Sequence, residues 1–352
     1  MSAPASTNLS VRTEELKSCI GCGGARLKVW CKGRDRLHGI TAQEFLYSRC
    51  RDCGLIFLTL RPLEEEIHKF YPENYGPYQI PGQETGSAVP ATRYLEALSN
   101  RLLLGAANAL NSAINRLLPD TSPEQLRESY RPPRKGAQLL DFGCGSDAFL
   151  NQARERGWAT TGMDFAESTV ERVRRSGHRA LLVSPSSWDE IEDGSFDFVR
   201  MSHVLEHLYH PRATLAKLRE KMSAGAVLHV GVPNPGSLTS RLFRSRWWGL
   251  ECPRHVALYT PRVLRKLLLD SGFVPFKVLH ESVTKDFARS LGYLLQDHGR
   301  LGGEGVDAMM HHGGVATLSH TPARLAARLG VADRFNVLAR KVEGPAPRTR
   351  AG

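Results

Sequence analysis

A short apolar run that contains an acid and leads into two glycines constrains the fold of this chain more than any other stretch. The run covers residues 138–142 and contains Asp141. Gly143 and Gly145 follow it, and a helical pattern begins at Ala148. This order predicts a strand, a tight turn and a helix. Glycines let a ligand approach the backbone of such a turn, and the amides at the helix start favour an anionic group, so we expect a nucleotide-like ligand here.

Two kinds of nucleotide ligand fit this turn. Gly143, Gly145 and Ala148 satisfy the relaxed dinucleotide pattern Gly-x-Gly-x-x-Gly/Ala. Asp164 ends a second expected strand about 20 residues further on, where an acid binds ribose hydroxyls. Asp141 would repel a pyrophosphate but attract the ammonium group of a methionine moiety. The turn therefore favours S-adenosylmethionine over NAD, and a dehydrogenase is the least favoured interpretation.

Two later segments carry a more specific pattern. Residues 196–211 read Phe-Asp-Phe-Val, then Ser-His-Val-Leu-Glu-His-Leu and a proline, and residues 247–261 read Trp-Trp-Gly-Leu, then Pro-Arg-His-Val-Ala-Leu-Tyr-Thr-Pro. Strands and helices alternate around these segments, which is typical of a parallel sheet covered on both faces. With the glycine turn, they resemble the class I S-adenosylmethionine-dependent methyltransferases over about residues 138–283. The resemblance implies an α/β, Rossmann-like sheet of seven strands, with S-adenosyl-L-methionine as the cofactor.

The resemblance also places the cofactor at the ends of the first four strands of the sheet. It implies the following cofactor-binding residues: Asp141, Gly143, Gly145, Met163, Asp164, Ser184 and His203. Two positions depart from the family pattern. Asp147 stands where a third glycine is usual, and we expect it to cap the following helix. Residues 184–188, which follow the third strand, contain no acid, so Trp188 or a serine would meet the adenine. These departures leave an inactive scaffold with the same fold as an alternative.

Three histidines are candidates for the general base. His207 is the first choice, because a neutral imidazole suits proton abstraction near pH 7; His203 is the second and His255 the third. A structural role for any one of them is the alternative. On a helix, His203, Glu206 and His207 would share one face. With His255 they form a candidate site for a divalent cation, similar to that of metal-dependent 2′-O-methyltransferases of small RNA, although His203 replaces an acid there.

Trp247, Trp248 and Arg254 are the candidate substrate-binding residues. Tryptophan and arginine suit a sugar ring, an aromatic ring or an anionic group. Packing of the tryptophan pair beneath the loop is the alternative. The fourth strand is not followed by an Asn/Asp-Pro-Pro-Tyr motif. Methylation of exocyclic base amines is therefore disfavoured.

Two Cys-x-x-Cys pairs near the N-terminus predict a metal site. The pairs are Cys19 with Cys22 and Cys50 with Cys53, and a glycine follows each pair. Four thiolates supply a closed tetrahedral zinc site, which is structural and not catalytic. Cys31 is an extra candidate ligand, and unliganded cytosolic thiols are the alternative. The segment resembles the zinc ribbon that precedes some bacterial methyltransferase domains acting on sugars and glycans.

Composition shifts divide the chain into several expected parts. These are a zinc-ribbon module (15–75), a linker with an amphipathic helix (76–135), the cofactor-binding core (136–283), a helical insertion or lid (284–333), the last strand (334–343) and a disordered tail (344–352). The helix is expected over 91–118, packed on the catalytic domain or over its cleft; attachment to a membrane is less favoured.

Charge and hydrophobicity limit the function further. The net charge of +11 is spread along the chain, so it does not by itself identify a nucleic-acid partner. Met1–Lys17 lacks an apolar signal region and no stretch is long enough to span a bilayer, so we expect a cytoplasmic protein. The predicted function is O-methylation of a small molecule or glycan precursor, with a histidine as base. An RNA methyltransferase is the alternative enzyme.

Overall fold

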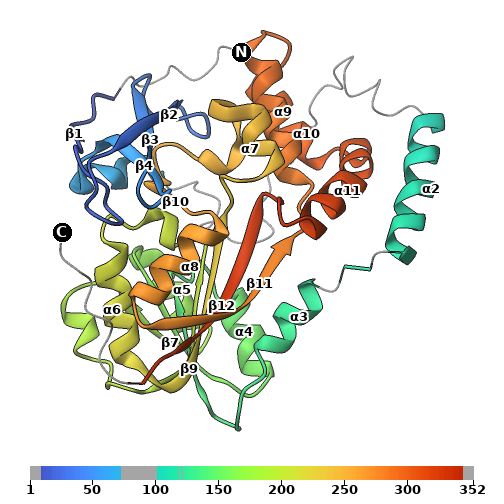
Figure 1. The fold of residues 1–352 in the computed structure, drawn as a ribbon. Helices are drawn as coiled ribbons and strands as arrows, with labels where there is room; N and C mark the ends of the chain where they lie inside the picture. The colour runs from blue at the N-terminus through green and yellow to red at the C-terminus, as the bar shows by residue number, and fades with distance from the viewer. Residues whose placement is uncertain (1–8, 73–100, 118, 121, 344–352) are drawn as a thin grey trace.

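The computed structural model describes residues 9–72, 101–117, 119–120 and 122–343 of the chain (Figure 1). The linker predicted after residue 76, the first ten residues of the helix predicted at 91–118 and the tail at 344–352 lie outside the described residues.

A seven-stranded sheet forms the centre of the molecule, with the order β11-β12-β9-β8-β5-β6-β7. Its strands are β5 (Gln138–Phe142), β6 (Ala159–Asp164), β7 (Arg179–Leu182), β8 (Phe196–Ser202), β9 (Met222–Pro233), β11 (Phe273–Glu281) and β12 (Arg334–Lys341). The strands from β7 to β9 pair in parallel, and β12 runs antiparallel to both of its neighbours. The predicted α/β fold with seven strands is confirmed.

Helices cover both faces of this sheet, because alternate side chains of the strands point to opposite sides. Leu139 packs with Leu150 and Val170 in one hydrophobic core, whereas its neighbour Leu140 belongs to another core with Leu215. The helices involved are α4 (Ala148–Glu155), α5 (Glu167–Arg175), α6 (Pro211–Lys221) and α8 (Pro261–Asp270). The start predicted for α8 is confirmed, since the Thr260 hydroxyl accepts a hydrogen bond from the Val263 amide.

A second, antiparallel sheet contains the cysteine-rich segment. Its strands are β1 (Thr13–Glu15), β2 (Leu27–Arg34), β3 (Glu44–Cys50) and β4 (Ile56–Pro62), followed by the 3-10 helix η1 (Glu64–Phe70). The order is β1-β4-β3-β2, and β10 (Ala257–Leu258) also pairs with β4. Since β10 comes from the loop that carries His255, the two sheets are joined directly next to the predicted catalytic residues.

Three helices follow β11, at the place of the predicted insertion: α9 (Lys285–Asp297), α10 (Gly303–His311) and α11 (Gly313–Arg328). In Figure 1 they lie beside α7 (Leu238–Phe243). Two further helices, α2 (Arg101–Leu117) and α3 (Ser122–Ser129), precede the core.

The described part of the predicted amphipathic helix is α2, and it lies against α11 at the edge of the molecule (Figure 1). The Asn111 amide donates a hydrogen bond to the Thr317 carbonyl of α11 at 2.9 Å. Leu102 and Leu117 of α2 are 86% and 75% exposed. Within the described parts of the chain, no helix is both long and apolar enough to cross a membrane.

Candidate functional site

The predicted glycine turn connects β5 to α4. Gly143 and Gly145 have φ angles of +71° and +63°, which side chains rarely tolerate. A Cβ atom on Gly143 would lie 2.4 Å from Cγ2 of Val204, and the Gly143 amide donates to the Met163 carbonyl at 2.7 Å. The turn therefore depends on glycine both for its conformation and for its close packing.

Asp164 is at the end of β6, next to this turn, as predicted. It is 4% exposed, and its carboxylate accepts hydrogen bonds from the amides of Gly145 at 2.8 Å and Ala166 at 3.0 Å. Burial raises the pKa of Asp164, although these amides favour its ionised form. The carboxylate thus fixes the turn and retains acceptor lone pairs for ribose hydroxyls.

Asp141 is completely buried and paired with a cation that the sequence analysis missed. Arg200 on β8 donates to both carboxylate oxygens, at 2.8 and 3.1 Å. The two residues are direct neighbours across the β5–β8 pair, and the guanidinium lies 4.1 Å from the ring centre of Phe149. Burial raises the pKa of Asp141, and Arg200 opposes this effect. Binding of a ligand ammonium by Asp141 stays a prediction.

Aromatic rings flank Asp164 on the side of the third strand. Trp188 stacks on Phe142 with a centroid distance of 5.8 Å, and Phe165, which is 52% exposed, meets the edge of Phe142 at 5.8 Å. Ser184 lies nearby, and its amide donates to the Ser187 hydroxyl at 2.9 Å. Phe165 was missed in the sequence, although it directly follows the acid that ends a strand.

Asp147 precedes α4 but makes no side-chain hydrogen bond to the helix amides. Its carboxylate instead accepts from Asn151 at 3.1 Å and from the Ser176 hydroxyl at 2.5 Å. It therefore connects α4 to the end of α5, and the expected cap is not formed.

The three predicted bases surround a buried acid at the end of β8. His203 follows β8 directly and has a φ of +56°, a strained value for a residue with a side chain. Glu206 and His207 lie on the 3-10 helix η4 (Leu205–His207), in place of a regular α-helix. Nδ1 of His203 is 3.3 Å from Oε1 of Glu206, and the rings of His207 and His255 are 4.6 Å apart.

The ring nitrogens of the two inner histidines contact backbone carbonyls. Nδ1 of His207 is 3.1 Å from the Arg254 carbonyl, and Nδ1 of His255 is 2.9 Å from the Gly249 carbonyl. A carbonyl oxygen only accepts, so a neutral His255 carries its proton on Nδ1, and His207 does so in the tautomer that donates to Arg254. In that tautomer Nε2 is the proton acceptor of the ring. The hydroxyl of Tyr71, which the sequence analysis missed, is 2.9 Å from Nδ1 of His207. Burial, together with the nearby His255, lowers the pKa of His207 to about 4.

Glu206 offers an unsatisfied oxygen to this cluster. It is completely buried, and its Oε2 has no hydrogen-bond partner among the described residues. Burial would raise the pKa of Glu206, but the hydrogen bond from His203 and the adjacent imidazoles together lower it. Ligand atoms of Glu206, His207 and His255 lie within 4.8 Å of one another, whereas His203 is outside this group. A buried oxygen without a partner suggests that a further group is bound here.

The predicted substrate residues are held by internal partners. Arg254 is fully buried, and its guanidinium contacts Asp35 and Glu251, each at 3.1 Å. The Trp247 indole donates to Asp333 at 2.8 Å. Trp248 is partly exposed and lies under the guanidinium of Arg289, 4.0 Å from the ring centre. Contact of these three residues with a substrate stays a prediction.

The four predicted zinc ligands converge. The sulfur atoms of Cys19, Cys22, Cys50 and Cys53 all lie within 4.8 Å of one another. The Gly21 amide donates to the Cys19 sulfur at 3.3 Å, as is common for a metal-bound thiolate. Cys31 lies on β2 and is not part of the cluster. The donor set and its spacing fit a zinc ion.

The central part of the chain is similar to known methyltransferases. Residues 106–278 match the Methyltransferase domain family. An uncharacterized 37.1 kDa protein in transposon TN4556 of Streptomyces fradiae is 32% identical over 173 residues, which cover 44% of this chain and 48% of that protein. The malonyl-[acyl-carrier protein] O-methyltransferase of Serratia marcescens is 30% identical over 128 residues, 36% of this chain and 49% of its own.

The chain thus spans about half the length of these curated relatives. Among solved structures, a SAM dependent methyltransferase from Archaeoglobus fulgidus aligns with 67% of this chain and 94% of its own, at 19% identity and a TM-score of 0.40. Residues 106–278, which contain the glycine turn and strands β5 to β9, therefore form a methyltransferase domain, and the strand order supports the predicted class I, S-adenosylmethionine-dependent family.

Proposed function

We propose that this protein transfers a methyl group from S-adenosylmethionine to an oxygen atom of a small molecule or glycan precursor. The observation that carries the proposal is the cluster of Glu206, His207 and His255, in which Glu206 and His255 are buried and His207 is half-buried. It lies beyond the end of β8, and the glycine turn lies beyond the end of the adjacent β5. Ligands of such sheets bind at the carboxyl ends of the strands, so a donor and a proton acceptor would meet there.

The residues of the turn suit the cofactor. Its sulfonium supplies an already activated methyl group, so the protein has to align the acceptor, exclude water and accept a proton. Gly143 and Gly145 place no side chain of their own against the methionine end, and Asp164 can accept hydrogen bonds from the ribose. Phe165 and Trp188 supply aromatic surface for the adenine in place of the missing acid.

His207 is the proposed proton acceptor. The Arg254 carbonyl holds its Nδ1 proton, which leaves Nε2 free to accept one. A pKa of about 4 keeps the ring neutral at physiological pH but also makes it a weak base. Ionised Glu206 lies beside it and would stabilise the imidazolium once it forms.

A divalent cation at Glu206, His207 and His255 is a second candidate for this cluster. The Nε2 atoms of both histidines and a carboxylate oxygen that has no hydrogen-bond partner among the described residues form the two-histidine, one-carboxylate set that several transition metals accept. Such an ion would lower the pKa of the acceptor hydroxyl, so that the hydroxyl could lose its proton without a strong base. His203, which lies outside the three-residue group, would then orient Glu206 through its hydrogen bond.

Calorimetric titration with S-adenosylhomocysteine tests the cofactor site. We expect micromolar binding by the wild type and a loss of about tenfold or more in Asp164→Ala, because the turn loses a hydrogen-bond acceptor and the ribose its partner. Glu167→Ala, at an exposed position nearby, is the matched control. Absence of binding by the folded wild type would support the inactive-scaffold alternative. A steep loss of RNA affinity with salt would support the RNA methyltransferase.

A further inference from the structure

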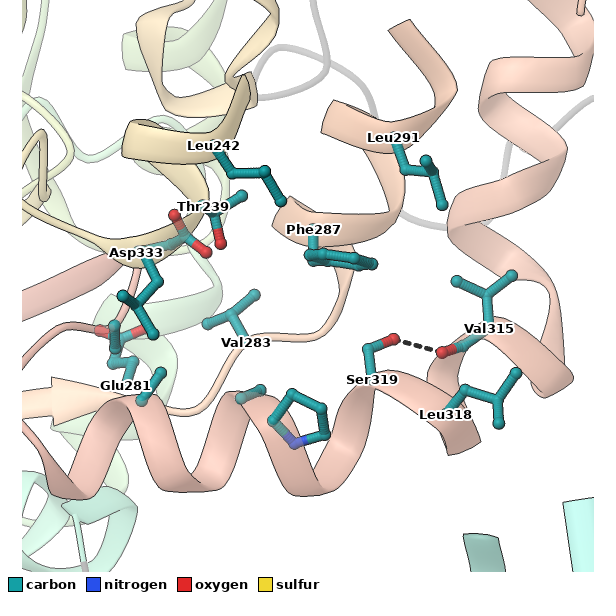
Figure 2. Close-up of a pocket in the computed structure, with 15 residues that line it drawn as sticks. Thr239, Leu242, Glu281, Val283, Phe287, Leu291, Val315, Leu318, Ser319 and Asp333 are labelled. Atoms are coloured by element: carbon teal, nitrogen blue, oxygen red, sulfur yellow. Dashed lines mark hydrogen bonds between the residues drawn. The ribbon is translucent and has the colours of Figure 1, made fainter. Parts of the chain in front are cut away.

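A cavity of about 360 Å³ lies at the same edge of the seven-stranded sheet as the proposed transfer site, and its lining shares no residue with that site. It is lined by α7, α9, α11 and the segment that follows β11, and it is partly open to solvent (Figure 2). Its walls are mostly aliphatic and include Leu242, Val283, Phe287, Leu291, Val315 and Leu318. This volume lies within the usual range of small-molecule sites, and the lining favours an apolar ligand.

The polar groups that line the cavity already have partners. Asp333 accepts hydrogen bonds from the Ser237 hydroxyl at 2.7 Å and from the Trp247 indole at 2.8 Å. Glu281 accepts from the Asn336 amide, and the Ser319 hydroxyl donates to the Val315 carbonyl. The described lining contains two carboxylates and no cation. It therefore disfavours an anionic or strongly hydrogen-bonding ligand.

The two ends of the cavity differ in polarity. In Figure 2, Thr239, Glu281 and Asp333 lie on one side, and Leu291, Val315 and Leu318 lie on the opposite side. The polar side is at the ends of β11 and β12, on the same edge of the sheet as the histidine cluster. Three strand intervals separate β11 from β8, or about 14 Å.

We propose that this cavity binds an aliphatic chain of the methyl acceptor, while the polar end of the same molecule reaches the histidine cluster. This inference rests on the proposed methyltransferase function. The Asp333–Trp247 hydrogen bond supports it, because it ties the polar end of the cavity to the loop that leads to His255.

Calorimetric titration with 1-hexanol, 1-octanol and 1-decanol tests the cavity. Each buried methylene is expected to raise affinity about fourfold until the cavity is filled. Ala323→Phe or Ala326→Phe on α11 fills the cavity and should weaken decanol binding at least tenfold, with S-adenosylhomocysteine affinity unchanged. Ala316→Phe, exposed on the same helix and outside the lining, is the matched control. Affinity that is independent of chain length would overturn the inference.

A second assay asks whether the chain belongs to the acceptor. Protein and methyl-labelled S-adenosylmethionine are incubated with a chloroform–methanol extract of bacterial cells, and also with the water-soluble extract. We expect label in the organic phase with the wild type and Ala316→Phe, and at least tenfold less with Ala323→Phe. Label confined to water-soluble products, equally with both variants, would refute a lipid-like acceptor. If the folded wild-type protein did not bind S-adenosylhomocysteine, the proposed function itself would be refuted.

Discussion

The carboxylate of Asp35 accepts a hydrogen bond from Nη2 of Arg254 at 3.1 Å, and both side chains are completely buried. Asp35 belongs to the cysteine-rich part of the chain, and Arg254 precedes His255 in the proposed transfer site. The Arg254 backbone carbonyl also holds Nδ1 of His207. A single residue therefore connects the N-terminal sheet to the position of the proposed base.

Removing one member of this pair should destabilise the protein. Asp35→Ala leaves a buried guanidinium with one carboxylate fewer, and the expected cost is about 3–5 kcal/mol in the free energy of unfolding. Urea denaturation measures it. Glu44→Ala, which breaks an exposed pair with Lys32, should cost less than about 1 kcal/mol. Equal effects of the two substitutions would contradict a structural role for the buried pair.

The zinc ion predicted at the cysteine cluster should stabilise the hydrophobic core next to it. Cys50 is buried in the same hydrophobic cluster as Phe57, Leu228 and Leu264, which come from the N-terminal sheet, the seven-stranded sheet and α8, respectively. We expect about one zinc ion per chain by elemental analysis, and both Cys50→Ser and strong chelators should remove it and lower the melting temperature. Cys31→Ser should keep the ion. Metal-free, fully stable wild-type protein would rule out the zinc site.

The amount of structure that could be predicted depends on the distance between partners along the chain. Residue spacing alone identified the glycine turn and the cysteine pairs, because those patterns are local. Arg200 was missed because its pairing with Asp141 depends on the register between β5 and β8. The roles of Tyr71 and Asp35 likewise depend on how the N-terminal segment packs against the transfer site, which local patterns do not specify.

Alanine substitutions at Gly136 and Gly143 should separate the cost of backbone strain from the cost of a steric clash. Gly136 and Gly143 have nearly equal φ angles, +74° and +71°, but only the Cβ at position 143 would meet another atom. Gly136→Ala should therefore cost about 1–2 kcal/mol of stability from strain alone. Gly143→Ala should cost more and also weaken S-adenosylhomocysteine binding, as measured by calorimetry. Val204→Ala should partly restore Gly143→Ala, because Val204 supplies the clashing methyl groups.

Acid should destabilise the fold through a buried histidine of β9. Nε2 of His229 is 2.8 Å from Oδ1 of Asn336, and burial, with Arg200 nearby, lowers its pKa to about 3. In the unfolded chain, His229 binds a proton near pH 6.5, whereas in the folded protein it stays neutral down to about pH 3. The stability that the neutral, buried ring contributes is therefore fully present above pH 6.5. It is lost as the pH falls towards 3, by about 1.4 kcal/mol of unfolding free energy per pH unit. Urea titrations at pH 7 and pH 5 should show a shallower pH dependence for His229→Gln. The exposed His210→Gln should behave like the wild type.

Substitutions in the histidine cluster should separate a general base from a metal site. His207→Ala should lower the rate of methyl transfer about 10²- to 10⁴-fold whichever role it has, and His210→Ala, three residues away and exposed, should not. Tyr71→Phe removes only the hydroxyl that contacts Nδ1 of His207, so its effect should be smaller than that of His207→Ala.

The two roles differ in how Glu206→Gln responds to added metal. If the cluster binds a cation, this variant loses a charged ligand, and Mn²⁺ or Zn²⁺ should restore part of its activity at high concentration. If His207 acts alone as the base, activity should be insensitive to chelators that leave the cysteine-bound zinc in place, and added metal should not restore it. His255→Ala extends the comparison, because it removes a ligand in the first case and only a neighbouring ring in the second. A wild-type rate in His207→Ala would refute both roles and would leave unexplained why Oε2 of Glu206 has no partner within the described residues.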